Sequence, residues 1–221
     1  MKACALSFFG LGYVGLTTAT CFASKGFKVV GCDVDKERVK AVNCGEVQFF
    51  EPGLGELVRH SVESGLLDAT IDPVQAVLST DVTWITVGTP NRKDGNVDLT
   101  YVESASRMIG EGLHLKGQWH LVVVKSTVPP TTTEKVVKVA LEKASGKCCG
   151  PDFGLCDNPE FLREGNAVED TLNPDRIVIG EIDKRSGDTL EDLYREFYGE
   201  KMPTAIRTTA VNAELIKYAN N

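Results

Sequence analysis

A glycine-rich hexapeptide near the amino terminus constrains the fold of this 221-residue chain more than any other feature. It reads Gly10-Leu11-Gly12-Tyr13-Val14-Gly15, and it separates a strand-like apolar run over residues 4–9 from a helical pattern over residues 14–24. In such a unit the first glycine permits a tight turn, the second lets a diphosphate approach the backbone, and the third lets the helix pack on the strand. Free N–H groups at the helix start then bind the diphosphate. The motif therefore predicts a dinucleotide site.

An acidic residue follows the second predicted strand, residues 27–32. A carboxylate there, Asp33, can accept hydrogen bonds from the ribose hydroxyls of NAD and would repel the 2′-phosphate of NADP. Arg38, one turn into the next helix, either modifies that preference or flanks the adenine. The alternative is an ordinary glycine turn with a solvated aspartate. Asp35 has a simpler interpretation, as the N-cap of the following helix. We expect NAD as the cofactor.

Strand-like and helix-like segments alternate along most of the chain. This rhythm is typical of a parallel, doubly wound sheet with helices on both faces. We predict an α/β, Rossmann-like fold with a mainly parallel sheet. The predicted strands are residues 4–9, 27–32, 82–87, 121–125, 153–156 and 176–179, and the predicted helices are residues 14–24, 35–41, 54–63, 100–112, 133–144 and 183–197.

The last part of the chain is predicted to leave this domain. Residues 202–207 are typical of a short strand or extended link, and residues 208–221 of a helix without a glycine stop or polar tail. We expect residues 1–205 to form an NAD-binding domain and residues 206–221 to begin a long central helix of a larger enzyme whose remainder is missing.

Composition argues against other classes of protein. The net charge is −7 and the basic residues are scattered, whereas a nucleic-acid surface needs a basic patch. Apolar runs fall short of the roughly 18 residues of a membrane span. No signal-peptide pattern opens the chain, so we expect no membrane partner and a cytoplasmic location. The seven cysteines form no paired CxxC arrangement and are expected to be reduced thiols, and no metal site is predicted.

Two further strands end in polar residues. Thr89 follows the strand over residues 82–87, and Thr127 follows the strand over residues 121–125. Because ligands of doubly wound sheets bind at the carboxyl ends of the strands, both threonines are candidate cofactor or substrate contacts. The alternative for each is a helix cap or a local hydroxyl-to-backbone turn.

Six motifs in this order resemble the UDP-glucose/GDP-mannose dehydrogenase family, and they span nearly the whole chain. They are Phe9-Gly10-Leu11-Gly12-Tyr13-Val14-Gly15-Leu16, Glu51-Pro52-Gly53-Leu54, Val87-Gly88-Thr89-Pro90, Lys125-Ser126-Thr127-Val128-Pro129-Pro130, Asn158-Pro159-Glu160-Phe161-Leu162-Arg163-Glu164-Gly165 and Glu214-Leu215-Ile216-Lys217-Tyr218. The resemblance implies a four-electron oxidation of the C6 alcohol of a nucleotide sugar to a carboxylate, with two NAD⁺ consumed and a cysteine thiolate as nucleophile. It also implies a homodimer in the full-length enzyme.

The same resemblance assigns roles to matching residues. The cofactor contacts are Gly10, Gly12, Tyr13, Val14, Gly15, Asp33, Arg38, Thr89, Thr127 and Glu164. The catalytic residues are Thr127, Glu160, Glu164, Lys217 and Asn221. The substrate contacts are Glu160, Phe161, Leu162, Arg163, Glu164, Lys217 and Asn221. Glu164 is expected at the nicotinamide end of NAD, where it can position or deprotonate water.

Spacing agrees with part of this assignment. Lys217 and Asn221 are four residues apart and share one helix face, where an ammonium and an amide can stabilise an oxyanion on C6. The alternative for Lys217 is a solvated helix lysine. For Glu160 and Glu164 the alternative is an acidic helix start after Pro159.

Two departures from the family pattern limit the assignment. Thr131 stands where the family usually has glycine, and no cysteine here has the sequence context of the family nucleophile. The chain alone is therefore expected to be inactive. Two other functions stay open: a stand-alone NAD-binding module, and a one-step β-hydroxyacid-type dehydrogenase. The sequence does not distinguish among UDP-glucose, UDP-N-acetylhexosamines and GDP-mannose.

Overall fold

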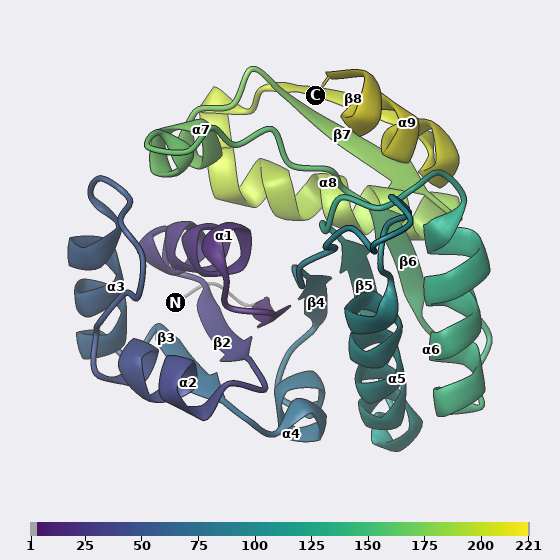
Figure 1. Ribbon diagram of the computed structural model, residues 1–221, viewed down its shortest axis with the longest axis horizontal. Helices are drawn as coiled ribbons and strands as arrows, with labels where there is room; N and C mark the ends of the chain where they lie inside the picture. The colour runs from purple at the N-terminus through teal and green to yellow at the C-terminus, as the bar shows by residue number, and fades with distance from the viewer. Residues whose placement is uncertain (1–3, 221) are drawn as a thin grey trace.

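The computed structural model describes residues 4–220, in which strands and helices alternate as the sequence predicts (Figure 1). The strands are β1 (Ala5–Phe9), β2 (Lys28–Cys32), β3 (Leu67–Thr70), β4 (Val82–Ile85), β5 (Leu121–Val124), β6 (Gly154–Asp157), β7 (Arg176–Glu181) and β8 (Thr204–Thr209). The helices are α1 (Tyr13–Ser24), α2 (Lys36–Asn43), α3 (Leu54–Glu63), α4 (Pro73–Leu78), α5 (Thr100–Leu115), α6 (Lys138–Ser145), α7 (Ala167–Leu172), α8 (Lys184–Tyr198) and α9 (Ala210–Asn220). A short π-helix, η1 (Thr133–Val137), precedes α6, and a 3-10 turn, η2 (Gly199–Lys201), follows α8.

Within the described residues the strands form one sheet in the order β3-β2-β1-β4-β5-β6-β7-β8. The chain moves outward from β1 through β2 to β3 and then crosses back to β4 on the other side of β1, with parallel pairing throughout. This reversal between β1 and β4 is the topological switch point at which doubly wound sheets bind ligands. The predicted Rossmann-like, mainly parallel fold is confirmed.

Helices pack against the sheet (Figure 1), and two clusters of buried apolar side chains lie between helices and strands. One cluster contains buried residues of α1, α2, α3 and α8, with Phe22, Trp84 and Phe197 among its largest side chains. The other contains buried residues of α4, α5 and α6. Because helices cover both faces of the sheet, strands β4 and β5 are buried along their whole length, and β5 consists of apolar residues alone.

The direction of the chain reverses after β6. The connection over residues 158–175 contains α7 and returns to the sheet at the edge where β6 ended, so β7 pairs antiparallel to β6. Helix α8 then crosses over, and β8 pairs parallel to β7. The sequence did not predict this reversal, nor the short elements β3, α4 and α7. The last helix is predicted over residues 208–221 with Thr208 or Thr209 as its N-cap. Strand β8 continues to Thr209, so α9 begins at Ala210, and the Thr209 hydroxyl accepts the N–H of Asn212 at 3.3 Å, as the predicted N-cap would.

The reversed strands determine where α9 ends. Since β8 ends at the edge opposite the carboxyl ends of β1–β6, α9 runs back along β7 toward those ends. The helix approaches β7 closely, because a Cβ atom at Gly180 would lie 2.6 Å from the Cβ atom of Ala213. At about 1.5 Å per residue, Lys217 lies about 10 Å further along the helix than Ala210. The last turn of α9 therefore reaches the carboxyl ends of the parallel strands.

Thr131, the departure from the family pattern, lies in a strained backbone conformation. Its φ is +77°, and it is the one described non-glycine residue with positive φ. Its N–H donates to the buried carboxylate of Glu214 at 2.5 Å, and the N–H of Thr133 donates to the same carboxylate at 2.7 Å. The carboxylate of α9 therefore holds this turn in place although a β-branched residue disfavours it.

We predict that Thr131→Gly stabilises the protein by about 1 kcal/mol, because relief of the left-handed strain exceeds the entropy that glycine adds to the unfolded chain. Urea unfolding measures the change. The control is Thr132→Gly, at a residue whose φ is −62°. It should lose about 2 kcal/mol, because glycine disfavours this conformation and the hydroxyl no longer donates to the backbone oxygen of Pro129. Equal destabilisation by both changes would contradict the strain at Thr131.

Candidate functional site

The glycine turn joins β1 to α1 with almost no space for side chains. Gly10 has φ +100°, and a Cβ atom there would lie 2.9 Å from the backbone oxygen of Thr86. A Cβ atom at Gly15 would lie 1.8 Å from the carbonyl oxygen of Gly10. At Gly12, by contrast, a Cβ atom would meet nothing within 4 Å, so this side of the turn is open. No side chain caps the N-terminus of α1, so the first N–H groups, those of Tyr13 and Val14 included, suit an anionic diphosphate.

Asp33 lies at the end of β2 beside the glycine turn and is 7% exposed. One carboxylate oxygen accepts the backbone N–H of Leu11 at 2.7 Å and a guanidinium N–H of Arg38 at 3.0 Å, and the other accepts the N–H of Asp35 at 3.0 Å. The second oxygen retains capacity for a ribose hydroxyl. Asp33 thus supports the turn as well as offering an acceptor next to it. Asp35 caps α2, as predicted, by accepting the N–H groups of Glu37 and Arg38.

We predict that Asp33→Ala weakens NAD⁺ binding about tenfold or more, because it removes both a charged acceptor and the support of Leu11. Isothermal titration calorimetry measures the dissociation constant. Asp68→Ala, at an exposed position of the edge strand β3, is the matched control and should bind as the native protein does. Unchanged affinity in Asp33→Ala would exclude this carboxylate from the site.

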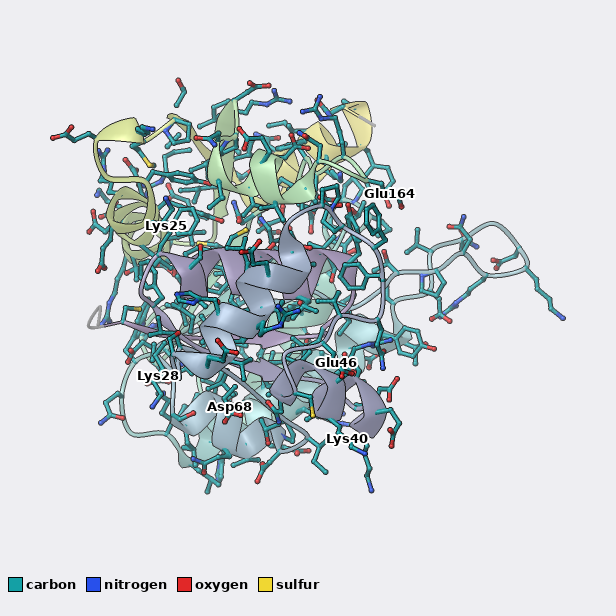
Figure 2. All side chains as sticks on the ribbon, turned by 90° about the vertical axis from the view of Figure 1, so that its left-hand side faces the viewer. Lys25, Lys28, Lys40, Glu46, Asp68 and Glu164 are labelled. Carbon is teal, nitrogen blue, oxygen red and sulfur yellow. The ribbon has the colours of Figure 1, made fainter. Side chains whose placement is uncertain are left out.

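The predicted threonines meet at the carboxyl ends of β4 and β5. The hydroxyl of Thr89 donates to the backbone oxygen of Thr127 at 2.8 Å, which ties the two connections together. Glu164 is exposed, and Figure 2 shows it on the right of that view, whereas Lys28, where β2 begins, lies on the left. Glu164 therefore lies on the side of the molecule where the parallel strands end.

The segment that carries the predicted acids is an extended loop and not a helix start, so the acidic-helix alternative is wrong. One carboxylate oxygen of Glu160 accepts the N–H of Leu162 at 2.6 Å and the other lies 2.9 Å from Nζ of Lys217. Lys217 is 5% exposed, so the solvated-lysine alternative is wrong as well. Its ammonium also lies 5.6 Å from the ring centroid of Phe161. Asn221, its predicted companion, lies outside the described residues.

Arg163 holds the loop to α7. Its guanidinium forms two hydrogen bonds with Asp170, at 2.6 and 3.1 Å, and its backbone N–H donates to the same carboxylate at 2.8 Å. The hydrogen bonds from Arg163 lower the pKa of Asp170 to about 2. A cavity of about 560 Å³ opens beside the loop, lined by Glu160, Phe161, Leu162 and Arg163 among others.

A second lysine lies beneath this loop, and the sequence did not identify it as a site residue. Lys125 is 7% exposed, and its Nζ donates to Oδ1 of Asn158 at 3.0 Å. The same oxygen accepts the hydroxyl of Tyr194, and the amide group of Asn158 donates to the backbone oxygen of Val178 at 2.8 Å. Burial lowers the pKa of Lys125 to about 8, opposed by the carboxylates of Glu160 and Asp157. A lysine directly after an apolar strand was the signal available in the sequence.

The lowered pKa of Lys125 gives stability a defined pH dependence. Between a folded pKa of about 8 and the ordinary 10.5, the unfolded chain binds a proton that the native state has released. The contribution of Lys125 therefore rises with pH across this window, by on the order of 3 kcal/mol in total. We predict that the free energy of unfolding of Lys125→Met, relative to that of the native protein, falls between about pH 7 and about pH 10, because only the native protein gains stability over this range. Urea unfolding at both pH values tests this, and a constant difference would contradict it.

Two other site types find no support within residues 4–220. No three His, Cys, Asp or Glu side chains are grouped so that they could hold a metal ion there. No helix in that range combines the length and hydropathy of a membrane crossing.

The fold and the site together define a dinucleotide-binding domain of the Rossmann type: a glycine turn at the switch point, an acid after β2 and polar strand ends beside them. The particular family follows from comparison. Residues 4–198 match the UDP-glucose/GDP-mannose dehydrogenase family, NAD binding domain. The chain belongs to this family and contains its NAD-binding domain.

Known relatives are about twice as long as this chain. GDP-mannose 6-dehydrogenase of Pseudomonas aeruginosa is 45% identical over 216 residues, which are 98% of this chain and 49% of that protein. UDP-glucose 6-dehydrogenase of Bacillus subtilis is 41% identical over 212 residues, or 96% of this chain and 44% of that protein. The chain thus spans about half the length of these relatives.

Solved structures agree with the same fold. The ternary complex of GDP-mannose dehydrogenase from Pseudomonas aeruginosa has a TM-score of 0.94 at 45% identity, covering 98% of this chain and 49% of that one. A UDP-glucose dehydrogenase from Pyrobaculum islandicum has a TM-score of 0.92 at 44% identity, covering 99% and 49%.

Proposed function

We propose that the protein containing this chain oxidises the C6 alcohol of a nucleotide sugar to the carboxylate with NAD⁺. The observation that carries the proposal is the ion pair between Lys217 and Glu160, at 2.9 Å. It joins the last turn of α9 to the loop at the carboxyl ends of the strands, the edge at which the glycine turn opens. A plain dinucleotide-binding module has no need of a buried lysine there.

The cofactor side of the proposal uses residues that fit a dinucleotide. The open face of Gly12 and the uncapped start of α1 would hold the diphosphate, and Asp33 with Arg38 would hold the adenosine ribose. Bound NAD⁺ supplies the hydride acceptor. Thr89, Thr127 and Glu164 would contact the cofactor further along, at the ends of β4 and β5 and on the loop.

The substrate side is served by the loop and α9. Glu160, Phe161, Leu162 and Arg163 would hold the sugar next to the cavity that they line. The Lys217 ammonium, together with Asn221, would stabilise negative charge that develops on the C6 oxygen. A preorganised donor of this kind typically contributes about 10²–10³ in rate. Thr127 and Glu164 would hold or deprotonate the water that releases the acid.

The thiol nucleophile is proposed to lie outside this chain. Burial raises the pKa of Cys21 and Cys32 to about 12, and raises that of Cys156 as well, so these thiols are poor nucleophiles. Cys148 and Cys149 precede β6 and therefore lie at the opposite edge of the sheet from the loop. Residues 1–221 alone should accordingly bind NAD⁺ without turning over a nucleotide sugar.

The nature of the sugar is a narrower question. Both GDP-mannose and UDP-glucose 6-dehydrogenases are among the relatives, at 45% and 41% identity, and the site residues above are compatible with either. We propose that the substrate is a nucleotide hexose of the UDP-glucose or UDP-N-acetylhexosamine type. GDP-mannose is the alternative substrate. A cytoplasmic homodimer is the proposed form of the full-length protein.

The test is an assay of the full-length protein with NAD⁺ and a panel of UDP- and GDP-hexoses. The absorbance of the reduced nicotinamide measures the reaction. We expect two NAD⁺ reduced for each sugar, the stoichiometry of oxidation to an acid. Reduction of one NAD⁺ with release of an aldehyde or ketone, or of none with any sugar, would refute the proposal.

Lys217→Ala in the same assay should lower kcat about 10²-fold or more while changing KM much less, because the ammonium acts on charge that develops in the transition state. Lys201→Ala, an exposed lysine of η2, is the matched control and should leave both constants unchanged. A rise in KM at constant kcat would show that Lys217 binds the substrate and does not act on the transition state.

A further inference from the structure

Glu51 is a buried carboxylate outside the proposed cofactor and substrate contacts. It is 5% exposed and is the first residue of a tight turn in which Pro52 precedes Gly53, whose φ is +77°. The N–H of Leu54 closes the turn by donating to the backbone carbonyl oxygen of Glu51 at 3.2 Å. Proline followed by a glycine with positive φ is the signature of a type II turn. The turn begins α3 and directs the Glu51 side chain into the molecule.

The carboxylate joins two segments that are far apart in the sequence. One oxygen accepts the hydroxyl of Tyr13 and the backbone N–H of Gly165, the latter at 3.0 Å. The other accepts the N–H of Ala167 at 2.8 Å and lies 3.4 Å from the N–H of Val168. The Gly165 N–H also lies 3.1 Å from the Tyr13 hydroxyl oxygen, which closes a three-membered network.

Glu51 accepts the N-terminal N–H groups of α7, which no side chain of α7 itself caps. No side chain within that helix caps its start, because the N-cap Asn166 makes no such hydrogen bond. Ala167 and Val168 are the first residues of α7, whose N–H groups have no partner inside the helix. The Glu51 carboxylate satisfies them from another element, and hydrogen bonds to an ionised acceptor are about twice as strong as neutral ones.

The carboxylate is held in its charged form. Burial by itself would raise the pKa of Glu51, but the hydrogen bonds from Tyr13 and from three backbone N–H groups outweigh burial and lower the pKa. Burial, and after it the hydrogen bond to Glu51, raise the pKa of Tyr13 to about 12, so its hydroxyl keeps its proton and remains a donor.

In the proposed function the two joined segments contact different parts of the same ligand, its central diphosphate and its nicotinamide end. Tyr13 is the first residue of α1, at the diphosphate, and Gly165 directly follows Glu164, which is assigned to the nicotinamide end. We propose that Glu51 is a positioning residue. It sets the separation between the glycine turn and the loop that carries Glu160 and Glu164, so that Glu164 contacts a dinucleotide bound at Tyr13. This inference rests on the proposed function for its consequence, but the network itself can be tested alone.

Glu51→Gln is the informative variant. It preserves size, but its NH₂ group places a donor where the backbone N–H groups need an acceptor. The matched control is Glu46→Gln, the same change at an exposed residue of the same connection, on the surface in Figure 2. Tyr13→Phe is the milder second variant, since it retains the ring packing on Phe49, at 5.2 Å between centroids, and removes only the hydroxyl.

Amide hydrogen exchange of the full-length protein tests the network without any sugar. We expect Glu51→Gln to speed exchange at Gly165, Ala167 and Val168 about tenfold or more over native, with Tyr13→Phe affecting mainly Gly165 and Glu46→Gln affecting none. Exchange that is unchanged at these amides, or raised equally across the whole chain, would overturn the proposal. Should Glu51→Gln fail to fold, absence of any local effect in Tyr13→Phe would overturn it as well.

Kinetics then tests the positioning role. In the NAD⁺-dependent assay we expect Glu51→Gln to lower kcat about tenfold while KM for NAD⁺ changes less than about threefold, because the diphosphate site stays intact. Equal kcat in Glu51→Gln and Glu46→Gln, with local exchange raised, would overturn the positioning role. If the native protein oxidises no nucleotide sugar, the proposed function fails, while the exchange data still decide the network.

Discussion

The closeness of α1 to the turn after β1 is the constraint on which this molecule depends. Because a side chain at Gly15 would overlap the Gly10 carbonyl oxygen, the helix begins against the strand and its free N–H groups face the end of the sheet. Asp33 reinforces the arrangement from β2 through the N–H of Leu11. Every other site residue is useful only because this short turn leaves a polar, open surface at the switch point between β1 and β4.

The reversal of β7 and β8 provides the second half of the site. A parallel continuation of the sheet would have sent the helix after β8 toward the wrong edge. Instead α9 packs closely over Gly180 and brings Lys217 to Glu160, where Phe161 and the buried Lys125 lie nearby. Lys217 is thus held by its ion pair with Glu160 and Lys125 by its hydrogen bond to Asn158, as the charge stabilisation that we propose would require.

The sequence predicted the parts of this design that have a local signal. The glycine turn, Asp33, the Asp35 cap and the long alternating elements follow from spacing and residue type. Strand β3 was missed because it is four residues long at the sheet edge and exposes Asp68. The reversal of β7 was missed because strand direction depends on tertiary packing of the connection. Lys125 and Glu51 were missed as site residues because their partners, Asn158 and residues 165–168, are distant in sequence.

A crystal structure of the full-length protein with NAD⁺ bound tests the central claim most directly. The account predicts the diphosphate at the N-terminus of α1 over Gly12, the adenosine ribose on Asp33 and the nicotinamide directed toward Thr127 and Glu164. A dinucleotide bound anywhere else, or a glycine turn covered by side chains so that the diphosphate cannot reach it, would contradict the account.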